Sequence, residues 1–192
     1  MPWEKAFDVD AALEKAGDTF WSNGYKATSM RDLLDAMGIQ KGSFYDTYGS
    51  KKEAYLRALE QYIETRAVAP GARAGQTPRQ ALELHLEQVF KECIGPDGHR
   101  GCMVVNCALE LAHSDATVGK VVRRALQDHE NFILQYIVAA QQMGDVSSSV
   151  DAAATAKAIF GIVIAMRVHA RAGTSTATLR TLVEQASALL DR

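Results

Sequence analysis

The sequence lacks the compositional features of disulfide-rich, collagen-like, disordered and membrane proteins. Its three cysteines, Cys93, Cys102 and Cys107, are an odd number and cannot form a fully paired disulfide framework, so we expect free thiols in a reducing compartment. With 14 glycines, four prolines and 47% hydrophobic residues among 192, a collagen-like or disordered chain is excluded. Neither a signal-peptide leader nor an uninterrupted apolar run of about 18 residues is evident. We therefore expect a cytoplasmic protein without a membrane-spanning segment.

The motifs of common enzymes and metal proteins are also missing. No glycine-rich phosphate loop, nucleophile elbow or H-E-x-x-H sequence occurs, and the five histidines show no paired spacing. Cys93, His99, Cys102 and Cys107 surround a Gly-Pro-Asp-Gly turn, but they lack the closely spaced cysteine pair of most zinc sites. A thiol sensor and small buried core residues are the remaining interpretations, and we favour the core. We predict no metal and no cofactor.

An excess of positive charge is absent as well, because the formal net charge is −2. This argues weakly against nucleic-acid binding, since lysine and arginine neutralise phosphates. The distribution matters more than the sum. Residues 26–57 carry six basic and four acidic side chains, whereas residues 1–25 carry two basic and five acidic ones. The contrast favours a nucleic-acid contact within 26–57 without establishing one.

Apolar residues recur at helical spacing along almost the whole chain, and no segment favours a strand. Local signals mark the helix ends: we expect Asp10 to cap the first helix, Gly38 to end the second, and Ser50 with Glu53 to cap the fourth. Pro78 suits the first turn of the fifth. The pattern predicts an all-α protein of about nine helices, roughly at 11–23, 30–37, 41–48, 51–66, 78–94, 102–112, 116–144, 152–172 and 175–190.

The segment 27–53, ATSMRDLLDAMGIQKGSFYDTYGSKKE, is the most informative part of the chain. It predicts two short helices joined by a tight turn at Gly38, with another helix directly after them, which is the layout of a helix-turn-helix DNA reader. Lys41-Gly42-Ser43 opens the second of these helices, where short side chains let the backbone approach base edges. Phe44 and Tyr48 are expected to face inward.

A set of residues at characteristic spacings runs through the first third of the chain. They are Phe20, Gly24-Tyr25, Thr28-Ser29, Leu33, Met37-Gly38, Lys41-Gly42-Ser43-Phe44-Tyr45, Tyr48, Gly49-Ser50-Lys51 and Glu53. In these residues and their spacing the sequence resembles the TetR/AcrR family of bacterial transcriptional repressors. The resemblance implies a three-helix DNA-binding domain at 1–48 and a helical effector-binding and dimerisation domain at 49–192. It also implies double-stranded operator DNA as the partner.

Position by position, the resemblance implies two groups of DNA contacts, one at the start of the second helix and one in the recognition helix and just behind it. Asp46 departs from the neutral or aromatic residue expected at its position. Residues 4–8 replace the usual leading basic cluster, so a phosphate contact by an N-terminal arm is not supported. The implied contacts are Thr28, Ser29, Arg31, Lys41, Gly42, Ser43, Tyr45, Thr47 and Lys51.

The stretch 101–110, GCMVVNCALE, resembles a segment that one branch of this family has just before its long seventh helix. The resemblance implies a position beside the effector pocket. Asn106 and Glu110 are four residues apart and share a helix face, so both could contact one ligand, and a solvent-facing or capping role is equally open. The predicted contacts with an unknown small-molecule effector are Cys102, Asn106 and Glu110.

The last two predicted helices carry more apolar surface than one chain is expected to cover. Packing of two copies as a four-helix bundle would bury it, which resembles how the family forms homodimers; an intramolecular core is the alternative. The residues concerned are Ala154, Ala158, Gly161 and Ala165 on one side of the eighth helix, Ile159, Ile162, Val163 and Met166 on another, and Leu179, Leu182, Val183, Ala186 and Leu190 in the ninth.

Together these features predict a non-enzymatic regulator that binds DNA, most simply a repressor released from a palindromic operator by a small molecule or a reactive effector. Two other classes stay open. Glu110 and His113 form the E-x-x-H half-motif of metal-dependent helical-bundle enzymes, although such enzymes need two copies and this sequence has one. A helical interaction module without DNA function is the second alternative.

Overall fold

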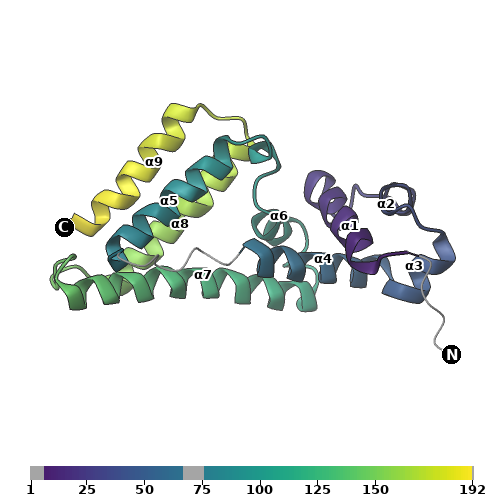
Figure 1. Cartoon of the computed structure of the whole chain (residues 1–192), viewed down its shortest axis with the longest axis horizontal. Helices are drawn as coiled ribbons and strands as arrows, with labels where there is room; N and C mark the ends of the chain where they lie inside the picture. The colour runs from purple at the N-terminus through teal and green to yellow at the C-terminus, as the bar shows by residue number, and fades with distance from the viewer. Residues whose placement is uncertain (1–6, 67–75, 192) are drawn as a thin grey trace. The chain divides into compact units, whose positions relative to one another are not determined.

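The computed structural model describes residues 7–66 and 76–191, and the regular structure within them is entirely helical. Figure 1 labels the α-helices, and its colours run from purple at the N-terminus to yellow at the C-terminus. Across the described residues the all-α class and the predicted number of nine α-helices are confirmed. The bounds are α1 Val9–Asn23, α2 Met30–Met37, α3 Lys41–Tyr48, α4 Lys51–Arg66, α5 Pro78–Ile94, α6 Met103–Glu110, α7 Ala116–Met143, α8 Ala152–Arg171 and α9 Thr176–Ala188, with short 3-10 turns η1 Gly98–Arg100 and η2 Leu189–Asp191.

The helix ends lie within about two residues of their predicted positions, because capping signals are local. The residue that caps α1 differs from the predicted one. Asp8, not Asp10, accepts the backbone N–H groups of Asp10 and Ala11, each at 3.0 Å, so the helix begins earlier than predicted. At the start of α4 the Ser50 hydroxyl accepts the Glu53 N–H at 3.1 Å, which is one of the two hydrogen bonds of the predicted cap.

The chain divides into two compact units, which are described separately. The first contains α1 to α4 and residues 106–122. The second contains 76–105 and 123–191 among the described residues. The helices α6 and α7 therefore each contribute residues to both units.

In the first unit, α1 packs against α2 and α4 around aromatic side chains. The Phe20 ring meets the Tyr55 ring edge-on, with centroids 5.0 Å apart, and Tyr25 meets Tyr55 at the same distance. Leu33 and Leu59 of the same unit are fully buried. This core holds the short helices α2 and α3 against longer ones, which matters because helices of eight residues are not stable alone in water.

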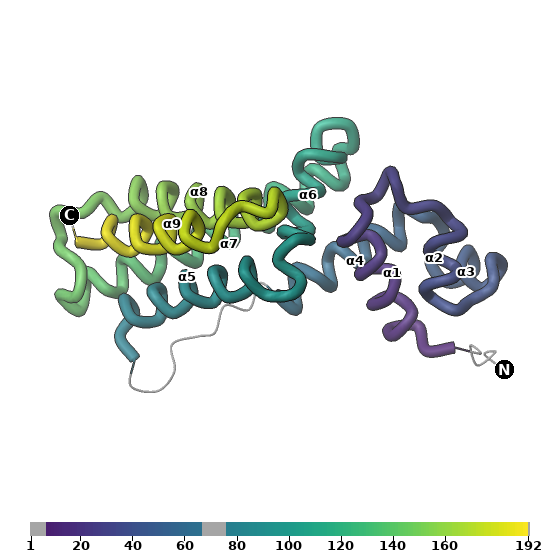
Figure 2. The backbone as a smooth tube through the Cα atoms, turned by 90° about the horizontal axis from the view of Figure 1, so that it is seen from above, coloured from purple at the N-terminus to yellow at the C-terminus, as the bar shows by residue number. Residues whose placement is uncertain are grey.

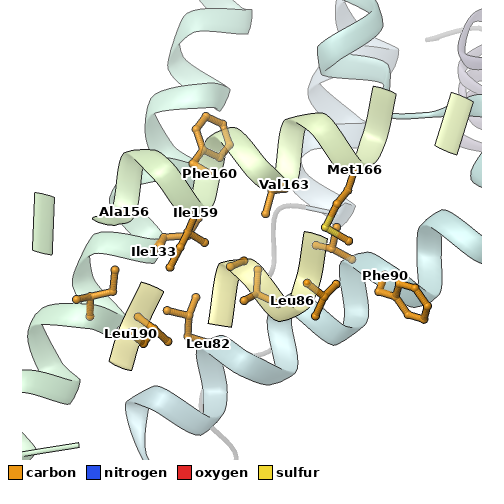
Figure 3. Close-up of a cluster of buried hydrophobic side chains, with 14 of the residues drawn as sticks. Leu82, Leu86, Phe90, Ile133, Ala156, Ile159, Phe160, Val163, Met166 and Leu190 are labelled. Atoms are coloured by element: carbon orange, nitrogen blue, oxygen red, sulfur yellow. The ribbon is translucent and has the colours of Figure 1, made fainter. Parts of the chain in front are cut away.

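In the second unit, α5, α8 and α9 run alongside one another (Figure 2). Their facing sides form one apolar cluster, to which α7 adds Ile133 and Ile137. Figure 3 shows Leu82, Leu86, Ile159 and other buried side chains of this cluster. The apolar residues predicted on α8 and α9 are therefore largely core: Ile159, Val163, Met166, Leu179, Val183, Ala186 and Leu190 are all buried within the same chain.

The helix α8 is long and apolar enough to cross a membrane by length and composition alone. The sequence-based expectation that no segment qualifies is therefore not supported by that criterion. The criterion is weak evidence for a membrane segment, since the core helices of soluble proteins also meet it. Here one side of α8 packs into the cluster of the second unit through Ile159, Val163 and Met166.

Replacing Ile159 with alanine should lower the free energy of unfolding by about 2–5 kcal/mol, because the side chain is fully buried and its removal leaves a cavity. Met143→Ala in α7, at a position 62% exposed, is the matched control and should change stability by less than about 0.5 kcal/mol. Urea unfolding followed by circular dichroism measures both. Equal losses in the two variants would contradict the core shown in Figure 3.

Candidate DNA-binding interface

The turn between α2 and α3 requires a glycine for its backbone conformation. Gly38 lies in the left-handed region, at φ 68° and ψ 31°, and its N–H donates to the Leu34 carbonyl at 2.9 Å. A Cβ added at Gly38 would meet no atom within 4 Å, so the constraint is the backbone angle and not space. The tight turn predicted from the sequence is thus formed by a glycine that ends α2 and lets the chain enter α3.

The inner side of α3 is fixed by two aromatic residues. Phe44 and Tyr48 are buried, as predicted, and their ring centroids lie 5.3 Å apart. The Tyr48 hydroxyl donates to the Val9 carbonyl at 2.8 Å, and burial raises the pKa of this hydroxyl. Because the inner side is anchored in this way, the rotation of α3 about its own axis is determined, and so is the set of residues that faces outward.

The outward side of α3 carries most of the predicted recognition residues. Lys41, Gly42 and Tyr45 are exposed, and Ser43 and Thr47 are half-buried. The structure therefore brings these five residues together on one short helix. Asp46 is exposed beside them and places one negative charge on the same helix.

Gly42 has no role in the internal packing. A Cβ at this position would meet no atom within 4 Å, and the backbone is not in the left-handed region. Glycine in a helix lowers its stability by roughly 0.5–1 kcal/mol relative to alanine. Among the described residues of the first unit, packing does not require a glycine at this position.

The start of α2 is a complete capping box. The Ser29 hydroxyl accepts the Asp32 N–H at 3.1 Å, and the Asp32 carboxylate accepts the Ser29 N–H at 2.8 Å. These hydrogen bonds, the one from the Ser29 backbone first, hold the pKa of Asp32 below its usual range. Arg31 and Asp35 are both exposed, and the Arg31 Nε atom lies 3.6 Å from Oδ2 of Asp35. Ser29 and Arg31 are thus both at the surface beside a helix N-terminus.

Two other predicted contacts are engaged within the protein. Thr28 is fully buried, and its hydroxyl donates to the Gly24 carbonyl at 2.6 Å, so its side chain is not available to DNA in this arrangement. The Lys51 ammonium lies 4.4 Å from the centre of the Tyr25 ring. Burial lowers the pKa of Lys51, while Glu110 and Asp32 oppose the shift.

The boundary between the two units falls among the predicted effector residues. Cys102 belongs to the second unit, whereas Asn106 and Glu110 belong to the first. The Glu110 carboxylate accepts two backbone N–H groups, from Tyr25 at 3.0 Å and from Lys26 at 2.6 Å. Its oxygens are thus directed at the loop between α1 and α2. No local sequence pattern predicts this contact, because the partners lie 84 and 85 positions away and contribute only backbone atoms.

Two of the cysteines occupy core positions, which agrees with the interpretation that the sequence favoured. Cys93 and Cys107 are buried, and all three thiols are free. Burial raises the pKa of both Cys93 and Cys107, so these thiols stay protonated at neutral pH. Cys102 is half-buried.

A pair of histidines that sequence spacing did not reveal lies inside the second unit. The Nε2 atoms of His85 and His129 are 2.9 Å apart, and the rings of Phe132 and Phe160 lie next to them. Burial lowers the pKa of His85 to about 3 and that of His129 to about 4, so both imidazoles are neutral at pH 7 and one donates to the other. Helix packing joins residues 44 positions apart, which no local pattern could show.

One side of α8 remains uncovered. Ala154, Ala158 and Gly161 are exposed, Ala165 is half-buried, and Val168 is 48% exposed. A Cβ at Gly161 would meet no atom within 4 Å. These positions follow one another at helical spacing, so they form a continuous stripe of small apolar side chains on the surface of the second unit.

Comparison with known proteins identifies the family. The sequence model of bacterial regulatory proteins of the tetR family matches residues 12–58, which include α2, α3 and the turn between them. The model of the tetracyclin repressor-like C-terminal domain matches residues 81–186, more than half of the chain. The chain belongs to the TetR family of transcriptional regulators. As a family member it is a helix-turn-helix DNA-binding protein and not an enzyme, so the resemblance noted in the sequence is confirmed.

Several relatives of this TetR-family chain have been described. BdcR of Escherichia coli (strain K12), an HTH-type transcriptional repressor, is 28% identical over 189 residues, which cover 94% of this chain and 93% of BdcR. YezE of Bacillus subtilis (strain 168), an uncharacterised HTH-type regulator, is 28% identical over 151 residues and 77% of each chain. A solved structure of the regulator CifR, carrying three cysteine substitutions and complexed with 26-base-pair operator DNA, is 25% identical with a TM-score of 0.84, covering 96% of this chain and 97% of CifR.

Family membership decides among the functional classes. TetR-family regulators are not enzymes, so the E-x-x-H half-motif formed by Glu110 and His113 is not part of an active site. The Glu110 carboxylate already accepts backbone N–H groups, and His113 is exposed. Among the residues that the structure describes, no group of three metal-binding side chains is found.

The buried histidine pair predicts a pH dependence of stability for this TetR-family protein. The folded-state pKa values, about 3 and about 4, lie below the ordinary value of 6.5, so the unfolded chain binds more protons between those limits. The free energy of unfolding should therefore fall as the pH drops from 6.5 to 4, by at most about 1.4 kcal/mol per pH unit for each histidine.

The double variant His85→Leu with His129→Leu should show a smaller decrease over that range, measured by urea unfolding at several pH values. The exposed His113, replaced by glutamine, serves as the control and should leave the pH slope unchanged. A double variant with the wild-type slope would show that the buried pair does not titrate as described.

Proposed function

We propose that this chain is a homodimeric repressor that binds a palindromic operator through α3 and the start of α2, and that a small-molecule effector acting on the helical domain releases it. The supporting observation is the anchoring of α3. Phe44 and Tyr48 hold its inner side, while Lys41, Gly42 and Tyr45 are left at the surface. A major groove admits one such helix, with its N-terminal residues nearest the base edges.

The proposed contacts have different chemical roles. Lys41 reaches a phosphate or a guanine edge, and Ser43 bonds a base or a phosphate. The hydroxyls of Tyr45 and Thr47 suit phosphates. Ser29 and Arg31 add a phosphate contact at the N-terminus of α2, where backbone N–H groups and the helix dipole favour an anion. Lys51 stands behind α3 as a further basic group.

The dimer is proposed to form through the stripe of small residues on α8, with support from α9. Small side chains allow two helices to approach closely, and the stripe is otherwise left in contact with solvent. The dimer would be symmetric, as most homodimers are, and would present two copies of α3. Their half-sites would lie about one turn of DNA apart (~34 Å) or wider, which fits a palindromic operator.

Release requires that the effector bind the two states of the protein unequally. A ligand that shifts α4, which directly follows α3 in the chain, would change the spacing of the two recognition helices in the dimer. The proposed effector contacts remain Cys102 and Asn106. Glu110, with both oxygens engaged, is better suited to another role.

A mobility-shift assay with the DNA upstream of the protein's own gene tests the proposal. The wild type should bind this DNA specifically, and Ser43→Ala combined with Tyr45→Ala should weaken binding at least about tenfold, because a hydrogen bond to a charged group such as a phosphate contributes about 1.5–3 kcal/mol. Ser148→Ala, at an exposed position in the second unit, is the control and should bind as the wild type does. Specific binding that survives the double substitution would show that the contacts are elsewhere.

Gly42→Ala separates helix stability from DNA recognition. It should raise the free energy of unfolding by about 0.5–1 kcal/mol, because alanine favours the helix and its Cβ meets no atom within the protein. The same methyl group should weaken operator binding, because it occupies space next to the DNA. Urea unfolding and a mobility-shift assay measure the two effects, and tighter or unchanged binding would mean that DNA does not approach this residue.

A further inference from the structure

The loop between α1 and α2 has backbone N–H groups that no neighbouring turn of helix can satisfy. Gly24 ends α1 at φ 84°, and its own N–H donates to the Phe20 carbonyl at 2.8 Å. The next two N–H groups, those of Tyr25 and Lys26, lie beyond the helix. Both are directed at the single carboxylate of Glu110 on α6.

The hydrogen bonds from these two residues end on different oxygens of the carboxylate, and the one from Lys26 is short. Tyr25 N lies 3.0 Å from Oε2 of Glu110, and Lys26 N lies 2.6 Å from Oε1. A carboxylate that accepts two backbone N–H groups forms charge-assisted bonds, which are stronger than bonds between neutral groups. The contact therefore fixes the loop in both position and orientation.

The surroundings of the carboxylate fit this contact closely. A Cβ at Gly24 would lie 3.0 Å from Oε2 of Glu110, so the loop approaches the carboxylate at a residue without a side chain. The Lys51 ammonium, over the Tyr25 ring, interacts favourably with the charge of Glu110. The buried Thr28 hydroxyl bonds the Gly24 carbonyl and holds the other side of the loop.

Two other contacts of the segment 106–115 involve α4. The Lys52 ammonium pairs with Asp115, just before α7, and the Tyr55 hydroxyl bonds the Cys107 thiol. Glu110 differs because it contacts the loop that leads directly to Ser29, the cap of α2. Through the short turn at Gly38, the direction of α2 also sets that of α3.

We propose that Glu110 is a positioning residue for DNA recognition, whose carboxylate attaches the α1–α2 loop to α6 and so sets the orientation of α2 and α3. This inference rests on the proposed function, in which α3 reads the operator. The helix α6 begins among residues of the second unit and ends, at Glu110, among those of the first. A displacement of α6 is therefore conveyed to the recognition helices through this side chain, in addition to the path through α4.

Hydrogen exchange of the intact protein, without DNA, tests the contact itself. In the wild type the Tyr25 and Lys26 amides should exchange slowly. Glu110→Gln removes the charge and one of the two acceptors, so these amides should exchange at least about tenfold faster. Asp115→Asn is the matched control: it weakens the pair with Lys52 but keeps an oxygen that can cap α7, and it should leave both amides protected.

Operator binding then tests the consequence. Glu110→Gln should weaken operator binding by about tenfold with helix content unchanged. The reason is that the α1–α2 loop is no longer held in one position in the free protein, so it must be ordered when DNA binds. Leu109→Ala, at the neighbouring and 82% exposed position, should bind as the wild type does. If Glu110→Gln fails to fold, Glu110→Asp serves instead, since its shorter side chain cannot reach both N–H groups.

The outcomes separate the two proposals. Rapid exchange of the Tyr25 and Lys26 amides in the wild type, or unchanged operator binding by a folded Glu110→Gln variant with faster exchange, would overturn the positioning role. Absence of specific DNA binding by the wild type, with both amides protected, would overturn the proposed function while the contact itself stands.

Discussion

The burial of Phe44 and Tyr48 under α3 is the interaction on which the DNA-facing surface depends. The helix α3 has only eight residues, too few to be stable alone, so its existence and its rotation are set by these two rings. The hydrogen bond from Tyr48 to Val9 ties α3 to α1, and the Arg57 guanidinium donates to the Thr47 carbonyl at 3.2 Å. With the inner side fixed from two directions, the outward residues can be small and polar without loosening the helix.

The same unit shows how backbone groups can link distant segments. The first N–H groups of a helix have no partner within it, and N–H groups of a loop need partners as well when they are shielded from water. At α2 the partner is local, since Ser29 and Asp32 satisfy each other. At the end of α1 the partner is Glu110, far along the sequence. A local cap stabilises one helix, whereas the distant one also relates two helices to each other.

The helix α8 has two sides with different surroundings in the second unit. Ile159, Val163 and Met166 enter the core, while Ala154, Ala158 and Gly161 stay at the surface. In the same unit His85 and His129 form a hydrogen bond between neutral imidazoles. Polar groups are costly to bury unless they are paired, and this pair meets the condition at pH 7.

The sequence by itself determined the helices, the turn at Gly38, the inward side of α3 and the family. Apolar periodicity, helix caps and turn glycines are local signals, so they can be recognised without knowledge of the tertiary structure. The sequence did not determine that Thr28 is buried or that the apolar residues of α9 serve the core of the same chain. It also did not show the partners of Glu110 or the meeting of His85 with His129. These were decided by tertiary packing, since they depend on which residues distant in sequence come within a few ångströms.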